Sequence, residues 1–442
     1  MIIFNSMRQN IELKGKFVTD DISRNLMSFE YSIFLNSNDE NVESSDQYSA
    51  YDFLIAVDAL ELIEPGNYAF ENLQNSFQRN PDWHFGFLSY DLKNQIENLD
   101  SYNADRMQIP LSGFFIPRFV FYGKDGKIFA SFRKDQNTKE DALKCWTDVT
   151  KSAKANTHLV EPEISAGTNQ IRYIENCHSV KKHIRYGDIY EMNYCLEFFS
   201  QGTDIDTAHV YNRLNNHSPM PFSAFLKMKN IHAVCASPER FIARRGNKII
   251  SQPIKGTAPR GKTAEEDEKI KNELSSSLKE RSENIMITDL VRNDLSRTAA
   301  KGSVKVEELC GVYTFKNLHH MISTVVSEQK PGVGLAEILK TTFPMGSMTG
   351  APKIRAMELI EEFEDFRRGL YSGSIGYISP NGDFDFNVVI RTVLYNSDLK
   401  VISFMAGSAI TTDADPEKEY RECLLKAESM MKALGMQIAT SQ

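Results

Sequence analysis

Several features that mark other protein classes are scarce or missing in this chain of 442 residues. No apolar stretch reaches the roughly 18 residues that a membrane-spanning helix needs. The first residues lack the basic start and long apolar run of a signal peptide. The six cysteines include no C-x-x-C pair, which favours reduced thiols over a disulfide framework or a zinc site. These absences predict a cytoplasmic protein that does not bind membranes.

Positively charged residues are also outnumbered, because the chain has 51 lysines and arginines and 59 acidic residues, which give a formal net charge of −8. Nucleic-acid binding requires a basic surface, so nucleic acid is not expected as a general partner. Neither the G-x-G-x-x-G nor the Walker pattern of nucleotide-binding loops is present, which disfavours a phosphotransferase. A site for a small anion would therefore need its own local positive charge, from lysine, arginine or a metal.

The pattern of apolar residues predicts long strands mixed with long helices and no regular βαβ alternation. This combination indicates an α+β fold with large antiparallel β-sheets flanked by helices. We expect an N-terminal region over residues 1–160, a linker near 157–170 and a second region over 171–436 that carries the chemistry. Strands are expected at 31–35, 83–88, 119–122, 128–132, 222–228, 231–237, 373–379, 384–395 and 400–406. Helices are expected at 50–63, 139–155, 171–187, 263–298 with a break near 275–277, 352–364 and 416–435.

Lys255 stands out because it lies in an apolar segment, next to Gly256 and between two prolines. The preceding residues predict a hairpin that turns at Gly246, which would hold the lysine at the end of its second strand. A partly desolvated lysine loses its proton more readily and becomes a nucleophile near neutral pH. Taken alone, the residue is better interpreted as an ordinary surface lysine at a strand end. A catalytic role therefore depends on the other residues singled out below.

Pairs of carboxylates recur at helical spacing in two segments, three residues apart in each. Such pairs on two helices could supply oxygens to Mg²⁺, whose remaining positions would be filled by water or substrate. Taken alone, solvated acidic helix faces explain them better. The residues are Glu280 and Glu283 in the first segment and Glu419 and Glu422 in the second, with Lys426 one turn further on.

Three further features could bind an anion or move a proton. The segment 343–353, rich in small residues and containing Thr349, precedes a predicted helix whose free N–H groups could bind a carboxylate or phosphate. Tyr377 and Arg391 fall on consecutive predicted strands, and a guanidinium within an apolar run needs an anionic partner, either a ligand or a structural salt bridge. His320 could act as an acid or base, or could be a core histidine, which we favour for the residue alone.

Together these segments resemble the chorismate-utilising family, which includes anthranilate synthase component I, aminodeoxychorismate synthase component I, isochorismate synthase and salicylate synthase. The strong match covers about residues 175–435, and a weaker one extends into the N-terminal region, where Gly86 opens a short matching motif. The resemblance implies that this region is interleaved with the core. The main motifs are Ser237-Pro-Glu-Arg-Phe241, Pro253-Ile-Lys-Gly-Thr257, Glu283-Asn-Ile-Met-Ile-Thr-Asp-Leu-Val-Arg-Asn-Asp294, Gly346-Ser-Met-Thr-Gly-Ala-Pro-Lys353, Gly373-Ser-Ile-Gly-Tyr377 and Ile390-Arg-Thr392.

Within that family, lysine at position 255 is similar to the aminodeoxychorismate synthases, whereas anthranilate synthases usually carry alanine there. The resemblance implies Mg²⁺-dependent amination of chorismate at carbon 4, which gives 4-amino-4-deoxychorismate for 4-aminobenzoate and folate synthesis. It implies ammonia from a separate glutamine amidotransferase subunit, component II, since no segment here resembles a glutaminase. Anthranilate synthase component I is the alternative.

The resemblance also implies roles for the residues singled out above. Lys255 would attack ring carbon 2 while Glu239 protonates the 4-hydroxyl, with His320 as a further catalytic residue. The Mg²⁺ would be held by Glu283 and Glu422, with Glu280 and Glu419 close by. The substrate would be bound by Arg391, Tyr377, Thr349, Lys426 and backbone N–H groups near Gly407.

Three departures from the family pattern leave questions open. Glu191 occupies a position where the isochorismate and salicylate enzymes have lysine and the aminating enzymes have glutamine. The family's Ala-Gly-x-Gly appears as Ala406-Gly-Ser-Ala409, whose side chains are expected to narrow the space beside the substrate. Phe34-Leu-Asn-Ser37 only partly matches the Leu-Leu-Glu-Ser segment through which relatives bind tryptophan, so feedback control is left open.

Overall fold

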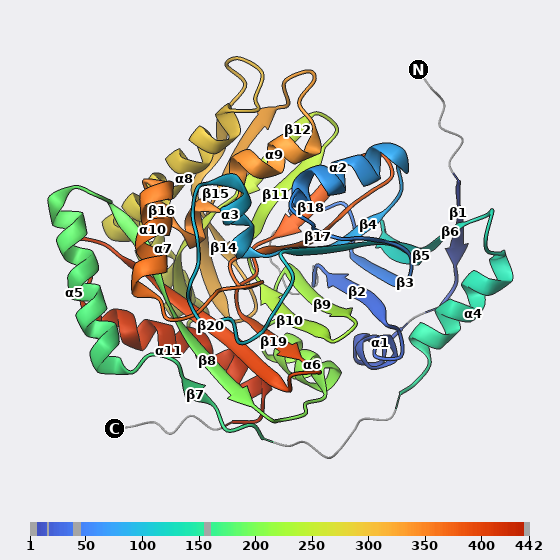
Figure 1. The fold of residues 1–442 in the computed structure, drawn as a ribbon, viewed down its shortest axis with the longest axis horizontal. Helices are drawn as coiled ribbons and strands as arrows, with labels where there is room; N and C mark the ends of the chain where they lie inside the picture. Colours follow the sequence, from blue (N-terminus) through green and yellow to red (C-terminus); the bar gives the residue numbers. More distant parts are fainter. Residues whose placement is uncertain (1–6, 16, 39–45, 154–160, 437–442) are drawn as a thin grey trace.

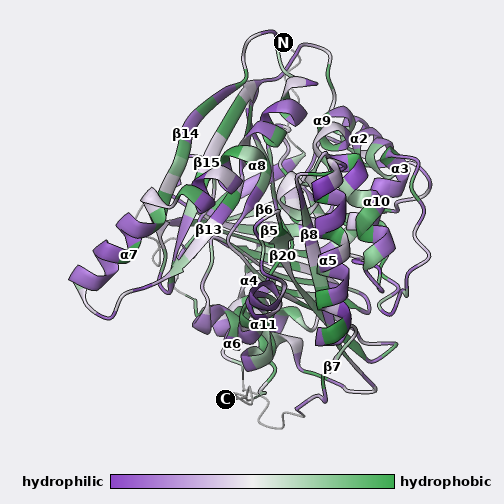
Figure 2. Cartoon of the chain, turned by 90° about the vertical axis from the view of Figure 1, so that its left-hand side faces the viewer, coloured by the Kyte–Doolittle hydropathy of each residue, from purple (hydrophilic) through white to green (hydrophobic). Residues whose placement is uncertain are grey.

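The computed structural model describes residues 7–15, 17–38, 46–153 and 161–436 (Figure 1). In this part of the chain every pairing between named strands is antiparallel, and the strands join in one hydrogen-bonded network. The helices lie around the outside of the strands (Figures 1 and 2). The expected α+β fold with large antiparallel sheets flanked by helices is therefore confirmed.

In the described part of the chain the α-helices range in length from four to 19 residues. They are α1 (Thr19–Leu26), α2 (Ala69–Arg79), α3 (Lys93–Ile96), α4 (Lys139–Thr150), α5 (Gln170–Tyr186), α6 (Thr207–His217), α7 (Ala264–Ser276), α8 (Leu278–Ser296), α9 (Leu335–Thr342), α10 (Lys353–Phe363) and α11 (Pro416–Ala433). Two short 3₁₀ turns are η2 (Tyr90–Leu92) and η3 (Gly346–Met348).

The strands differ widely in length. They are β1 (Arg8–Leu13), β2 (Tyr31–Asn36), β3 (Phe53–Ile63), β4 (His84–Leu88), β5 (Ser112–Lys124), β6 (Lys127–Arg133), β7 (Ser165–Ala166), β8 (Glu191–Gln201), β9 (Phe222–Met228), β10 (Ile231–Ser237), β11 (Arg240–Arg245), β12 (Lys248–Gln252), β13 (Ile254–Pro259), β14 (Lys305–Thr314), β15 (Leu318–Glu328), β16 (Gly350–Ala351), β17 (Ser374–Ile378), β18 (Phe384–Asn387), β19 (Thr392–Asn396) and β20 (Val401–Ile410).

Two large hydrophobic cores lie on opposite faces of these strands. Along β3, Leu54 and Ala56 belong to one core, while Ile55 and Val57 belong to the other. This alternation follows from the two-residue period of a strand. Residues of α2, α8 and α9 complete the first core, and residues of α1, α4, α5, α6 and α11 complete the second. The strands are thus sandwiched between helices, with apolar side chains on both faces.

Most predicted elements are confirmed, including the hairpin of β5 and β6 and the break between α7 and α8 at Ser277. The helix predicted over 50–63 is wrong, because 53–63 is strand β3. Its apolar run at 53–57 is buried on both faces, and such a run fits a helix or a buried strand equally well. Pairing with β2 and β5 decides in favour of the strand. The long strand predicted over 384–395 is divided into β18 and β19 by residues 388–391.

Segments from both halves of the chain meet in the sheet. Strand β2 pairs with β9, and β4 pairs with β17 (Figure 1). Residues 157–160 of the expected linker lie outside the described residues, and the division at 160 stays a prediction. Among the described residues, no helix is both long and apolar enough to cross a membrane. The expected cytoplasmic location stays a prediction.

Candidate active site

A cavity of about 950 Å³ lies between α8, α11, β13 and β20. Both acidic helices and the lysine-bearing strand line it, so segments more than 150 residues apart in sequence face one space. It is lined by most of the residues singled out in the sequence: Glu239, Lys255, Glu280, Glu283, His320, Arg391, Gly407, Glu419, Glu422 and Lys426. Tyr377 and Thr349 are not among the residues that line it.

Lys255 lies on β13, which pairs with β15 rather than closing the hairpin of β11 and β12. The side chain is only 12% exposed, and its Nζ lies 2.5 Å from Oε1 of Glu191. From α8, Asn284 donates a hydrogen bond to the lysine carbonyl at 3.3 Å. Strand pairing and this helix contact therefore fix the lysine backbone, while Glu191 fixes its amine.

The protonation of Lys255 differs from the expectation. Burial lowers the pKa of Lys255, but the negative charges of Glu191, Glu283 and Glu239 outweigh it, so the pKa lies above the usual lysine value. The prediction that desolvation leaves this amine without its extra proton near neutral pH is therefore wrong for the protein without substrate. The amine is an ammonium ion that must lose a proton before it can act as a nucleophile.

Glu239 lies just before β11 and is almost fully buried. Its Oε1 accepts a hydrogen bond of 2.7 Å from the Ser347 hydroxyl. Burial raises the pKa of Glu239 to about 7, although the bond from Ser347 and the charge of Lys255 oppose this. A carboxyl group with this pKa is partly protonated at neutral pH and can donate a proton.

The four carboxylates of α8 and α11 face the same cavity. Burial raises the pKa of Glu283 to about 7, partly offset by Lys255. Burial likewise raises the pKa of Glu419, which accepts a hydrogen bond from the Ser408 hydroxyl. Glu422 pairs with Lys426 at 2.7 Å. Among the described residues, no group of three or more His, Cys, Asp or Glu side chains is already arranged to hold a metal ion.

Arg391 brings a guanidinium group to the cavity wall. It lies between β18 and β19 with a φ of 51°, in the left-handed region that non-glycine residues rarely adopt. Its guanidinium has no hydrogen bond or ion pair with any residue in the described part of the chain, so the structural salt bridge is not formed there. Burial lowers its pKa to about 10, so it remains charged. A partly buried, uncompensated cation is expected to attract an anionic ligand.

His320 lies on β15, and its Nδ1 is 2.9 Å from the Thr257 hydroxyl. Its Nε2 is buried and has no hydrogen-bond partner among the described residues. Burial and the charge of Arg391 lower the pKa of His320 well below its usual value, so the imidazole is neutral. A neutral imidazole with one unsatisfied nitrogen in a cavity can donate or accept one hydrogen bond to a ligand.

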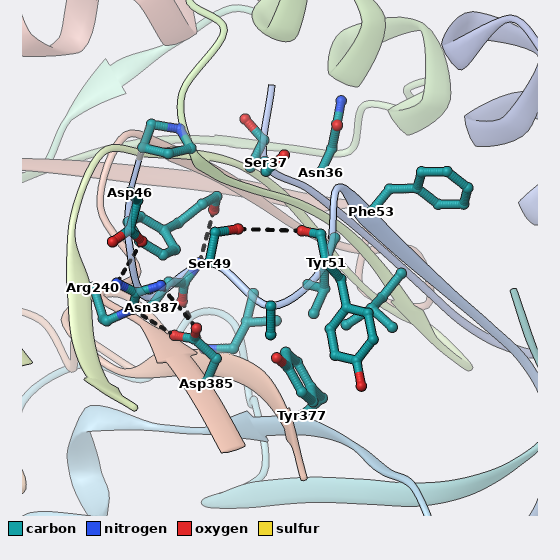
Figure 3. Close-up of a pocket in the computed structure, with 17 residues that line it drawn as sticks. Asn36, Ser37, Asp46, Ser49, Tyr51, Phe53, Arg240, Tyr377, Asp385 and Asn387 are labelled. Atoms are coloured by element: carbon teal, nitrogen blue, oxygen red, sulfur yellow. Dashed lines mark hydrogen bonds and ion pairs between the residues drawn. The ribbon is translucent and has the colours of Figure 1, made fainter. Parts of the chain in front are cut away.

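The placement of Tyr377 in the substrate site is wrong. This residue lies on β17 and packs against Tyr51 and Trp83, with ring centroids 5.8 Å from each. It borders a different cavity of only about 80 Å³, where Arg240 pairs with Asp46 and Asp385 (Figure 3). Side chains along a strand alternate between faces, so the motif alone did not show which face Tyr377 takes.

The tyrosine that does line the large cavity is Tyr371, six residues earlier and 3% exposed. The sequence analysis missed it, although it lies two residues before the motif that begins at Gly373. Its backbone N–H donates to the carbonyl of Arg368 in the turn before β17. The turn residues before the strand, rather than the strand itself, therefore face the cavity.

Thr349 is also misplaced by the sequence analysis. It is fully buried, and its hydroxyl donates to the Met345 carbonyl, which closes the turn after η3. Ser347 and Met348 of the same segment line the cavity instead. Ser408 is not among the residues that line the cavity, and its hydroxyl donates a hydrogen bond to Glu419, so its side chain does not narrow the substrate space as expected, whereas Ala409 does line the cavity.

Gly407 lies on β20, opposite Cys195 of β8. A Cβ atom at this position would come within 2.5 Å of the Cys195 sulfur. Its carbonyl accepts a hydrogen bond of 2.9 Å from Lys426. Glycine is therefore required for the close approach of β20 to β8 at the cavity wall.

Comparison with known proteins gives a consistent result. The family described as chorismate binding enzyme matches residues 32–432. Aminodeoxychorismate synthase component 1 of Bacillus subtilis is 34% identical over 365 residues, covering 79% of this chain and 76% of that protein. Anthranilate synthase component 1 of Thermus thermophilus is 32% identical over 397 residues, covering 87% and 85%.

The fold is similar to a solved structure as well. The crystal structure of anthranilate synthase component I from Streptococcus pneumoniae superposes with a TM-score of 0.75 at 24% identity, covering 88% of this chain and 93% of that one. This likeness concerns the fold alone. The match to most of the sequence and the identity to full-length relatives together show that the chain belongs to the chorismate binding enzyme family.

Proposed function

We propose that the protein is the synthase component of an aminodeoxychorismate synthase. It would aminate chorismate at carbon 4 in a Mg²⁺-dependent reaction and give 4-amino-4-deoxychorismate, the precursor of 4-aminobenzoate for folate synthesis. The observation that carries the proposal is the amine of Lys255 in the same cavity as the acid Glu239 and the unpaired cation Arg391. The relative from Bacillus subtilis bears the corresponding name.

The donor chemistry of the cavity fits a magnesium ion. Carboxylate oxygens are the ligands that Mg²⁺ prefers, and the four carboxylates of Glu280, Glu283, Glu419 and Glu422 face one space. The raised pKa values of Glu283 and Glu419 have burial as their main cause, and a divalent cation would stabilise the ionised forms of both. Glu283 and Glu422 would hold the ion, with Glu280 and Glu419 close by. When bound, the ion would supply positive charge that binds the ring carboxylate of chorismate.

The protein's own residues would perform the remaining steps. Arg391, with the hydroxyl of Tyr371, would hold the enolpyruvyl carboxylate, and Lys426 and His320 also line the cavity. The Lys255 nitrogen would bond to ring carbon 2, both conjugated ring double bonds would shift by one position, and the bond from carbon 4 to the hydroxyl would break. Glu239 would donate its proton to that leaving hydroxyl, which departs as water.

Ammonia would complete the reaction by bonding to carbon 4, which shifts both double bonds back and breaks the bond between carbon 2 and the Lys255 nitrogen. The new ammonium group would return a proton to Glu239, so the acid is restored. The ammonia would come from a separate glutamine amidotransferase subunit, component II, for which a free ammonium salt can substitute in a test.

The proposal is tested by incubating the purified protein with chorismate, Mg²⁺ and an ammonium salt and identifying the product by mass and fluorescence. We expect 4-amino-4-deoxychorismate. Anthranilate would contradict the proposal and establish the anthranilate synthase component I reaction, which the relative from Thermus thermophilus makes the alternative.

Lys255→Ala should reduce product formation at least about a hundredfold while Mg²⁺-dependent chorismate binding persists. Because it would leave Glu191 as a buried unpaired carboxylate, the double variant Lys255→Ala/Glu191→Gln is the better-folded form of the test. Lys340→Ala, which removes an ion-paired lysine outside the cavity, is the control. Undiminished activity of the Lys255 variants would remove the covalent step.

A further inference from the structure

The carboxylate of Glu191 has no role in the reaction described so far. Glu191 is the first residue of β8, and its backbone lies opposite Ala351 of β16. Its side chain is 1% exposed, and Oε1 pairs with Lys255 Nζ at 2.5 Å. Oε2 is equally buried and has no hydrogen-bond partner among the described residues. One oxygen therefore holds the amine while the other keeps unused lone pairs.

The proposed reaction requires a recipient for one lysine proton, because an ammonium nitrogen has no lone pair with which to bond to carbon. Three further carboxylates act on the charge of Lys255: Glu239, Glu283 and Glu422. Glu239 must hold a proton of its own in order to donate it to the leaving hydroxyl. Glu283 and Glu422 must stay ionised if they hold Mg²⁺. Glu191 is the remaining carboxylate, and it is the one already bonded to the amine.

We propose that Glu191 is a positioning residue that holds the Lys255 amine as an ammonium ion in the resting protein and accepts one of its protons when the nitrogen bonds to the chorismate ring. This inference rests on the proposed function. When bound substrate excludes water, the Lys255–Glu191 ion pair loses solvation, which favours transfer of the proton from the amine to the carboxylate. The unpartnered Oε2 gives the carboxylate a second position for the proton.

The protons balance over one turnover. The ammonium of Lys255 passes one proton to the Glu191 carboxylate, which leaves a neutral amine and a carboxylic acid. The amine bonds to carbon 2 as the hydroxyl leaves with the Glu239 proton. When ammonia displaces the lysine, the released neutral amine takes its proton back from Glu191, and Glu239 recovers its proton from the new ammonium group. Only water and the aminated product are released.

The resting state is tested without substrate, by acetylating the intact protein with acetic anhydride over a range of pH and measuring modification of Lys255 by peptide mass spectrometry. Glu191→Gln keeps the shape of the side chain and removes its charge. We expect Lys255 in this variant to react about tenfold faster or more at neutral pH, because each unit of pKa changes the neutral fraction tenfold. An unchanged rate would overturn the role of Glu191 in protonation.

Glu197→Gln provides a matched control on the same strand. Glu197 is also buried on β8, but it pairs with Arg106 at 2.6 Å and accepts a hydrogen bond from Ser403, away from the cavity. Its variant removes a buried carboxylate of the same chemistry. Acetylation of Lys255 should be unchanged in it, and an increase equal to that of Glu191→Gln would assign the effect to general loosening and overturn the proposal.

The proton transfer is tested by the rate at which chorismate, with Mg²⁺ and without ammonia, forms an adduct at Lys255, followed by rapid quenching and intact mass spectrometry. Transfer inside the Glu191–Lys255 pair does not depend on the pH of the solution, whereas in Glu191→Gln the lysine must lose its proton to solvent. Below the lysine pKa found by acetylation in the variant, the ratio of variant rate to wild-type rate should therefore rise about tenfold per pH unit.

Taking the ratio removes the contributions of the other groups that face the amine, because Glu239, Glu283, Glu422, Lys279 and Lys426 are present in both proteins. A ratio that stays constant with pH would overturn only the proton transfer to Glu191, and the proposed function would still stand. Absence of any adduct in the wild-type protein would overturn the covalent step of the proposed function, and the transfer with it.

Discussion

At the scale of single residues, charge pairing decides the properties of the cavity. Burial alone would lower the pKa of Lys255, yet its contact with Glu191 reverses the sign. Arg391 shows the opposite case, because its charge is buried without an ionic partner in the described part of the chain. A residue type in a motif therefore indicates the chemistry available, while the neighbours that the fold supplies determine the protonation state.

Tyr371 and Tyr377, which lie six residues apart, give a test at this scale. Tyr371 lines the cavity, so Tyr371→Phe should remove one hydrogen bond to the substrate. The KM for chorismate should therefore rise about threefold to tenfold. Tyr377→Phe removes the same hydroxyl from the aromatic cluster around Tyr51 and should leave KM unchanged. Steady-state kinetics of both variants provide the measurement. A larger effect of Tyr377→Phe would place the substrate elsewhere.

At the scale of elements, the start of α8 positions two of the proposed metal ligands. The chain breaks at Ser277, whose hydroxyl accepts a hydrogen bond from the backbone N–H of Glu280 and caps the helix. Glu280 and Glu283 then lie one turn apart on the face toward α11, which carries Glu419 and Glu422. In the proposed function, the two helices together would supply the carboxylates that hold one Mg²⁺ ion.

Glu283→Gln should raise the Mg²⁺ concentration needed for half-maximal chorismate binding by about tenfold or more, because a charged oxygen ligand becomes a neutral one. Titration calorimetry at several Mg²⁺ concentrations measures the effect. Glu273→Gln is the matched control, since Glu273 lies on α7, is largely exposed and does not line the cavity. An unchanged metal requirement in Glu283→Gln would reject that residue as a ligand.

At the scale of the whole molecule, the N-terminal strands are part of the sheet that carries the cavity. Strand β4 lies between β5 and β17, and β2 lies between β3 and β9. Removing the N-terminal region would expose the edges of β9 and β17 together with the core residues that β3 and β4 cover. The cavity walls and the N-terminal region are therefore expected to be stable only together.

A protein reduced to residues 161–436 should fail to fold cooperatively, with no sharp transition in differential scanning calorimetry and strong binding of a hydrophobic dye. The full chain, under identical conditions, should unfold in a cooperative transition. A cooperative transition of 161–436 that also retains chorismate binding would contradict this expectation and show that the second region is an independent domain.

The sequence by itself determined the fold class, the family and most of the charged residues that line the cavity, because residue spacing and motif order can be recognised without knowledge of the fold. The tertiary structure decided which tyrosine faces the cavity, that 53–63 is a strand, and that Lys255 is paired with Glu191. These properties depend on strand pairing and on contacts between residues far apart in the chain, such as the 64 positions between Glu191 and Lys255. Local patterns carry no information about such contacts, so only the folded molecule reveals them.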